Sequence, residues 1–278
     1  MIKKKNEQKN TDEANFVYKE KYGIFSDKFK LIPAPNFMLR RNAILDAIYN
    51  LKPGKLMEIG FGTGVCTYEF YIRGFQCTGY ELEQKSIMFA DALFNANENK
   101  IIDFRGVLYE EDYGAYDYLA IFEVLEHIPD DKNALEFWNR LLKDNGHIII
   151  SVPAKQKYYS YLDKVSGHVR RYERDDLLQL LSITGYNVEK ILCLGFPLSN
   201  LLRIPFNYLI RRPQYNQKNL LSDKERTCES GYLRLKDYKY RRIMPYSLIY
   251  IFSLIQRLFY NRDWGYGYVI VAKKNGVR

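Results

Sequence analysis

The sequence contains few of the residues that build metal sites and disulfide frameworks. It has four cysteines and three histidines in 278 residues, and no two cysteines show Cys-x-x-Cys spacing. Cys66 and Cys77 fall in apolar segments, where a small buried thiol is the expected role. Neither a His-Glu-x-x-His motif nor a Gly-x-Ser-x-Gly motif occurs. We therefore expect no metal site, and the chemistry of those two motifs is excluded.

Long apolar runs are also missing. The longest segment that is apolar nearly all round, 245–260, has 16 residues. A membrane-spanning helix needs about 20. Residues 1–15 are polar and charged without an apolar stretch, so we expect them to be disordered and see no secretory signal. The expected location is the cytoplasm.

Charge is distributed unevenly along the chain. The formal net charge is +9, yet residues 197–278 alone contain 16 Lys and Arg against 5 Asp and Glu. The basic character therefore belongs to the C-terminal third. It indicates an anionic partner there, such as a lipid headgroup, a phosphorylated substrate or a nucleic acid.

Residues 55–81 contain the most informative pattern in the sequence. The apolar run 56–59 predicts a buried strand, three glycines follow at 60, 62 and 64, and a helix is expected over 65–72. A second strand, 75–80, ends at Glu81. Glycines let a ligand approach the backbone closely, and an acid after the second strand accepts hydrogen bonds from ribose hydroxyls. The pattern indicates a nucleoside site.

The glycine spacing identifies the kind of nucleoside. A dinucleotide fingerprint, Gly-x-Gly-x-x-Gly, would place its third glycine at position 65, which is Val65. Glu58-Ile-Gly-Phe-Gly-Thr-Gly64 instead resembles the first motif of the class I S-adenosylmethionine-dependent methyltransferases. Glu123-Val-Leu-Glu-His-Ile128 resembles a motif of their quinone-biosynthesis branch. S-adenosylmethionine is the cofactor that this resemblance implies.

The resemblance also implies which residues form the cofactor site. They are Glu58, Gly60, Phe61, Gly62, Gly64, Glu81, Leu82, Glu123, Val124 and His127. For His127, a structural role at the start of a helix competes with a role in the site. One position departs from the family pattern, because Val107 stands where an acid commonly binds adenine. Asp103 lies close to this position in the sequence, but we do not predict that it replaces the acid.

The order of elements predicts an α/β fold with a doubly wound, mostly parallel seven-stranded sheet. The remaining strands are expected at 101–104, 116–122, 147–152, 188–194 and 265–274, with helices between them. The cofactor core covers 51–196 and its last strand lies in 263–278, antiparallel according to the resemblance. Residues 16–50 are expected to form a helical cap, and residues 197–262 a helical lid between strands six and seven.

The loop 154–172 follows the fifth strand and carries the candidates for chemistry. Our first candidate for a general base is His168, with Asp163 or Tyr172 orienting it or the substrate. The candidate substrate contacts are Tyr158, Tyr159, Arg170 and Arg171, the arginines gripping an anionic group. The alternative is that His168 and Arg170 bond the backbone and stiffen the loop.

The reaction expected is methyl transfer to oxygen on a small or lipid-linked metabolite. The Pro-Pro-Tyr type of motif that amino-group methyltransferases carry after strand four is missing, as is a Pro-Cys nucleophile. Two rivals remain: an enzyme that modifies peptide or RNA through the basic region, and a non-catalytic scaffold. The lid is either buried against the domain or a second subunit, or lies on an anionic membrane surface at the inner membrane face. Specific nucleic-acid binding is not expected, and the sequence leaves the oligomeric state open.

Overall fold

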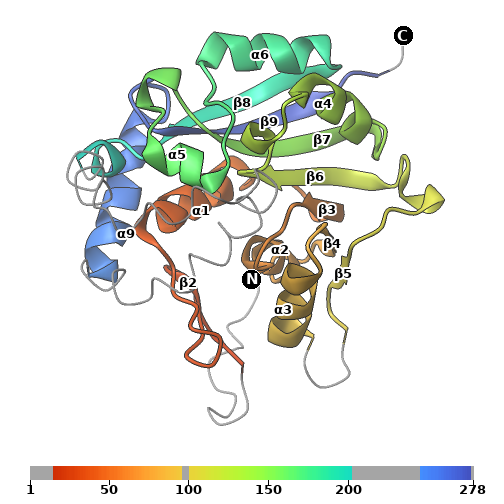
Figure 1. The fold of residues 1–278 in the computed structure, drawn as a ribbon, viewed down its shortest axis with the longest axis horizontal. Coiled ribbons are helices and arrows are strands. Elements are labelled where there is room, and N and C mark those ends of the chain that lie inside the picture. Colours follow the sequence, from red (N-terminus) through yellow and green to blue (C-terminus); the bar gives the residue numbers. More distant parts are fainter. Residues whose placement is uncertain (1–14, 96–99, 202–244, 277–278) are drawn as a thin grey trace.

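The computed structural model describes residues 15–95, 100–201 and 245–276, and Figure 1 shows these parts as ribbons. Their centre is a seven-stranded sheet in the order β5-β4-β3-β6-β7-β9-β8. Its strands are β3 (Lys55–Ile59), β4 (Gln76–Tyr80), β5 (Asp103–Arg105), β6 (Tyr116–Phe122), β7 (Leu142–Pro153), β8 (Tyr186–Leu194) and β9 (Gly267–Lys274). The predicted seven-stranded sheet is confirmed.

The pairing is parallel from β5 through β7, and β9 runs antiparallel to both β7 and β8. The antiparallel last strand is therefore also confirmed. Its position inside the sheet follows from its composition. The run Tyr268-Val-Ile-Val-Ala272 is buried on both faces, as a central strand requires.

Helices cover both faces of the sheet and create two separate cores (Figure 1). One core packs under α1 (Pro35–Ala47), α2 (Val65–Tyr71) and α3 (Gln84–Phe94). The other packs under α4 (Asp131–Asn139) and α6 (Arg174–Ile183). Alternate residues of a strand enter opposite cores, as Leu56 and Met57 of β3 do. This sandwich fixes the carboxyl ends of β3, β4 and β6 along one edge.

The segment 16–50 differs from the predicted helical cap. Only α1 is helical; before it, β1 (Val17–Lys19) and β2 (Gly23–Phe25) form an antiparallel hairpin. Arg41 of α1 holds the hairpin, since its guanidinium donates to the Glu20 carbonyl oxygen (2.9 Å) and pairs with buried Glu69 of α2. Gly23 has φ +95°, which favours a turn over a continuing helix.

Most of the predicted lid lies outside the described residues. Its described C-terminal part is α9 (Tyr246–Ile255) with the short 3-10 turn Gln256–Phe259. Both pack on α1: Asn42 donates to Ser253 (2.7 Å), and Gln256 donates to the Leu39 carbonyl oxygen (2.9 Å). Among the described helices, none has the length and apolarity needed to cross a bilayer.

Candidate functional site

The glycine loop connects β3 to α2 at the edge where the parallel strands end. Gly60, Gly62 and Gly64 all adopt positive φ, at 70°, 56° and 73°. A Cβ on Gly60 would lie 2.5 Å from a methyl group of Val124, whereas a Cβ on Gly62 would meet nothing within 4 Å. The first glycine therefore allows close packing inside the protein. The second leaves an open surface against which a ligand can lie.

Glu81 lies beside this loop, directly after β4. Its carboxylate accepts hydrogen bonds from the backbone N–H groups of Gly62 (3.1 Å) and Leu82 (2.8 Å). The two bonds orient the carboxylate next to the open face of Gly62. This arrangement fits the ribose of S-adenosylmethionine, since a fixed carboxylate can accept hydrogen bonds from both ribose hydroxyls.

Glu58 lies beneath the loop, where it is 2% exposed. Burial raises its pKa to about 8, and the negative charge of Glu81 adds to the effect, while the Thr67 hydroxyl donates a hydrogen bond that opposes it. Phe61 is buried too, with its ring centroid 4.8 Å from that of Phe104. These two residues support the loop from below.

Glu123 directly follows β6 and has a left-handed conformation, with φ +57°. Such a conformation is uncommon for a residue with a side chain and is typical of functional sites. Its carboxylate lies 3.3 Å from the guanidinium of Arg40 and accepts a hydrogen bond from Ser151 (3.3 Å). Arg40, on α1, thus lies beside a predicted site residue, and sequence reasoning missed this contact because nothing in the neighbouring sequence indicates it.

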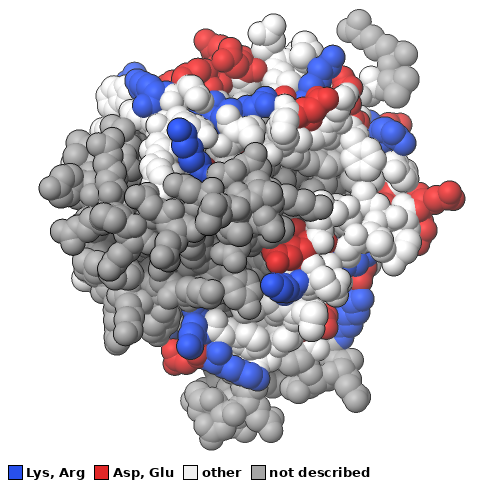
Figure 2. Space-filling model, viewed as in Figure 1, with Lys and Arg blue, Asp and Glu red and all other residues white. Residues whose placement is uncertain are grey.

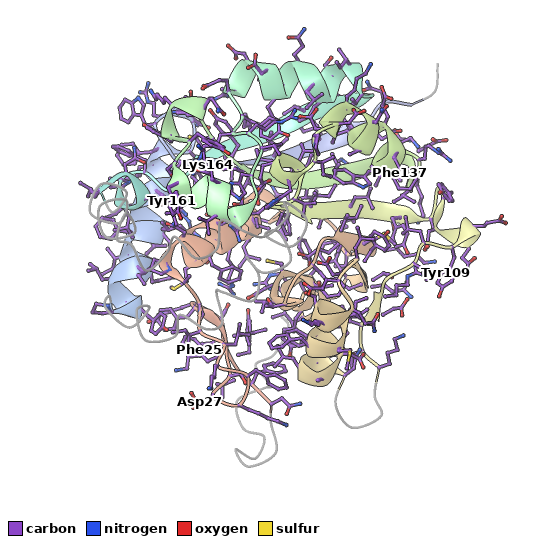
Figure 3. All side chains as sticks on the ribbon, viewed as in Figure 1. Phe25, Asp27, Tyr109, Phe137, Tyr161 and Lys164 are labelled. Carbon is purple, nitrogen blue, oxygen red and sulfur yellow. The ribbon has the colours of Figure 1, made fainter. Side chains whose placement is uncertain are left out.

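Asp163, His168 and Arg171 form a compact ionic cluster around α5 (Tyr161–Ser166), whose Tyr161 and Lys164 are labelled in Figure 3. Asp163 lies 2.9 Å from His168 Nδ1 and accepts a hydrogen bond from Arg171 Nε (2.8 Å). Burial opposes ionisation of Asp163, but the hydrogen bond from His168 and the charge of Arg171 hold its pKa below the usual range. The predicted pairing of Asp163 with His168 is present in the structure.

His168 also meets residues from the end of β6. The ligating atoms of Glu126, His127 and His168 all lie within 4.8 Å of one another. Sequence spacing gave no sign of this cluster, because two of its members follow β6 and the third follows α5. His127, predicted near the cofactor, has its imidazole against that of His168, with ring centroids 4.7 Å apart.

Three other residues of the loop were predicted to orient His168 or to contact the substrate. In the structure their polar groups contact other residues of the protein instead. Tyr172 is buried, with its hydroxyl 2.9 Å from Asp131, and so ties the loop to α4. Arg170 pairs with the same Asp131 (2.6 Å). Arg171 is buried between Asp163 and the ring of Tyr266. Because their polar groups are satisfied internally, these three residues stabilise the loop.

The two tyrosines predicted to contact substrate stand around this cluster. The Tyr159 hydroxyl donates to the His168 carbonyl oxygen (2.7 Å), and the Tyr158 ring stacks on that of Tyr266. At the expected adenine end, Val107 is about half exposed, and Asp103 pairs with Lys100 and Arg105.

Comparison with known proteins shows the family and the fold of the chain. The chain is 33% identical over 101 residues to a ubiquinone biosynthesis O-methyltransferase of Chromobacterium violaceum, covering 35% of this chain and 43% of that protein. It is 30% identical over 128 residues to the enzyme of the same name from Bordetella bronchiseptica, covering 45% and 52%. The chain thus spans about half the length of the curated relatives it matches.

Solved structures share the fold at low identity. The [4+2]-cyclase SpnF superposes with a TM-score of 0.54 at 16% identity, covering 87% of this chain and 82% of that one. Haemonchus contortus phosphoethanolamine N-methyltransferase 2, solved with S-adenosyl-L-methionine, gives a TM-score of 0.53 at 16% identity, covering 86% and 52%. The methyltransferase domain family model matches residues 37–191, more than half of the sequence, and the chain belongs to this family.

Proposed function

We propose that this protein transfers a methyl group from S-adenosylmethionine to an oxygen atom of a small or lipid-linked metabolite. The observation that carries the proposal is the pairing of two features at the sheet edge. The open glycine loop with Glu81 fits a nucleoside. The loop that carries His168 meets the residues after β6 on the same side. A cofactor and an acceptor can meet between them.

Methyl transfer requires few catalytic groups from the protein. Bound S-adenosylmethionine supplies a methyl group that is already electrophilic, so the chain must position the acceptor and exclude water. In this proposal Glu81 holds the ribose, and Glu123 with Arg40 lies near the methionine end of the cofactor. His168, oriented by Asp163 at 2.9 Å, accepts the proton of the acceptor hydroxyl.

Oxygen is the favoured acceptor atom for two reasons. The curated relatives named above are O-methyltransferases by name. The chain also lacks the motifs of amino-group and cytosine methyltransferases after β6, where Glu123-Val-Leu-Glu-His127 stands instead. Those relatives match over about half their length, so the acceptor of this protein is proposed only as a class.

A lipid-linked acceptor has support from α9. This helix exposes large apolar side chains, among them Ile251 and, in the turn after it, Leu258, which is 79% exposed. Most of the basic residues of the C-terminal third, such as Arg241 and Arg242, lie outside the described residues. On the face shown in Figure 2, acidic and basic side chains of the described residues are mixed. Pelleting with anionic liposomes, reduced by Ile251→Glu with Leu258→Glu, tests this part of the proposal. An equal fraction pelleted by the variant would refute it.

Two alternative functions, a non-catalytic scaffold and an enzyme for peptide or RNA, can be distinguished from this proposal by experiment. A fold neighbour that is a cyclase shows that this fold also hosts other chemistry. A non-catalytic scaffold would bind cofactor without turnover, and an enzyme for peptide or RNA would transfer labelled methyl to macromolecules. Incubation with methyl-labelled S-adenosylmethionine and fractionated cell extract separates the three outcomes by where the label appears.

The first experiment is calorimetric titration with S-adenosylhomocysteine, with NAD in parallel. We expect micromolar affinity for the former only, weakened about tenfold to hundredfold by Glu81→Ala because charged hydrogen bonds contribute about 1.5–3 kcal/mol. Glu136→Ala is the matched control, since that carboxylate lies on α4 and pairs with Lys132. Absence of binding, or an equal effect of both variants, would contradict the proposed cofactor site.

A further inference from the structure

The cluster of Glu126, His127 and His168 has the composition of a metal site. Each residue offers one ligand atom, and these atoms lie within 4.8 Å of one another. Glu126 is fully buried, and the side chain of His168 is 10% exposed. A carboxylate and two imidazoles are ligand types by which proteins bind divalent transition-metal ions.

Both imidazoles are held by their Nδ1 atoms. His127 Nδ1 lies 3.2 Å from the carbonyl oxygen of Gly167, and His168 Nδ1 lies 2.9 Å from the carboxylate of Asp163. A carbonyl or a carboxylate oxygen accepts a hydrogen bond, so both contacts require a proton on Nδ1. In a neutral imidazole with this proton, the lone pair is on Nε2. Histidines that bind metal are typically oriented in this way by a carbonyl or carboxylate partner.

The spacing also fits an ion better than a hydrogen bond. His168 Nε2 lies 3.8 Å from Glu126 Oε1, which is too far for a direct hydrogen bond. Two ligands at about 2.0 Å from a tetrahedral ion lie about 3.3 Å apart. A shift of about half an ångström would therefore place both atoms on one ion.

We propose that Glu126, His127 and His168 bind a divalent transition-metal ion such as Zn²⁺ or Co²⁺. Two imidazoles favour such ions over Mg²⁺ and Ca²⁺, which prefer oxygen ligands. Three protein ligands leave at least one position open for water or for an oxygen of a bound molecule. With the ion bound, Nε2 of His168 is a ligand and cannot also accept a proton, so His168 acts as the base proposed above only in the metal-free protein. The site itself depends on no step of the proposed methyl transfer.

Direct metal binding tests the inference. The tag-free full-length protein, dialysed against chelator and then given Co²⁺, should bind one ion per chain and develop visible absorption bands of a bound ion. Zn²⁺ should displace it and Mg²⁺ should not. Glu126→Gln keeps the side-chain shape and should weaken Co²⁺ binding at least tenfold. Asp163→Asn, which removes the carboxylate behind His168, should weaken it by about tenfold to hundredfold.

The chain supplies its own matched control. It has three histidines, and His147 lies on β7, paired with Glu189 at 3.2 Å and outside the cluster. His147→Ala should keep full Co²⁺ binding, while His168→Ala should lose it. Circular dichroism and titration with S-adenosylhomocysteine check that each variant is folded. No bound ion in the folded wild type, or equal loss in His147→Ala and Glu126→Gln, would overturn the proposal.

Discussion

Glu58 and Asp163 are both almost fully buried, yet the fold treats the two carboxyl groups in opposite ways. Glu58 lies under the glycine loop with a hydroxyl as its hydrogen-bond partner, and burial raises its pKa to about 8. Asp163 has His168 and Arg171 against it, and its pKa is lowered in spite of burial. Burial alone therefore does not decide the charge of a group. The presence of a cation beside it does.

The same contrast separates the half of the site proposed to bind the cofactor (the cofactor half) from the half proposed to bind the acceptor (the acceptor half). The cofactor half is built from backbone and from acids next to glycines, and it keeps an open face at Gly62. The acceptor half is an ionic network whose charged groups hold one another, with Arg171 between Asp163 and Tyr266. We expect substitutions in the first half to change ligand binding, and substitutions in the second to change stability.

Asp163→Ala should have the largest effect. The variant leaves the guanidinium of Arg171 buried without its carboxylate, and breaking such a pair costs about 3–5 kcal/mol. Urea denaturation measures this loss of the free energy of unfolding. Asp103→Ala is the control, because its carboxylate is 41% exposed and the same measurement should change by less than about 1 kcal/mol. Similar losses of stability in both variants would contradict the claim that the buried ion pair contributes more than the exposed one.

Gly62→Val should act on binding. A branched side chain there fills the open face beside Glu81, so affinity for S-adenosylhomocysteine should fall at least about a hundredfold, or about 2.7 kcal/mol. Gly114→Val is a close control, since Gly114 also has positive φ (67°) and a Cβ added there would meet nothing within 4 Å. It carries the same backbone strain outside the site. An equal loss of affinity in both variants would assign the effect to strain.

Glu58→Gln should change how stability depends on pH. The ordinary pKa of 4.5 rises to about 8 on folding. The folded state therefore binds more protons between these values, and stability falls as pH rises from about 4.5 to about 8. Glutamine mimics the protonated acid and should remove this fall, with a gain of about 2 kcal/mol at pH 8 because relaxation and water reduce the full effect. Parallel stability curves for both proteins from pH 5 to pH 8 would contradict the raised pKa.

Arg170→Ala should have the smallest effect. Its side chain is 33% exposed where it pairs with Asp131, and such pairs contribute about 0.2–1 kcal/mol. Arg171→Ala, one residue further on, should cost several times more because its pair is buried. Thermal denaturation of the two variants side by side gives the ratio. Equal losses of thermal stability would mean that burial does not make the Arg171 ion pair stronger than that of Arg170.

The parts of the site that are contiguous in sequence were predictable, and the rest depended on the fold. The strand, glycine loop and Glu81 follow from one stretch because each is a local backbone requirement. The contact of His168 with Glu126 and His127 joins segments that only the sheet brings together. Tyr172 was predicted to orient His168 or the substrate, because its burial against Asp131 cannot be read from a tyrosine-rich loop. The hairpin of residues 17–25 was missed because its partner, Arg41, lies on the following helix.

The position of β9 in the sheet has a consequence during synthesis. β9 pairs with both β7 and β8, and β8 joins the sheet through β9. On the ribosome, β7 therefore remains an open edge until residues 267–274 leave the exit tunnel. Unpaired edges of this kind invite pairing with other chains. A nascent chain of this protein should accordingly associate with chaperones until β9 emerges, because the sheet can close only when β9 is available for pairing.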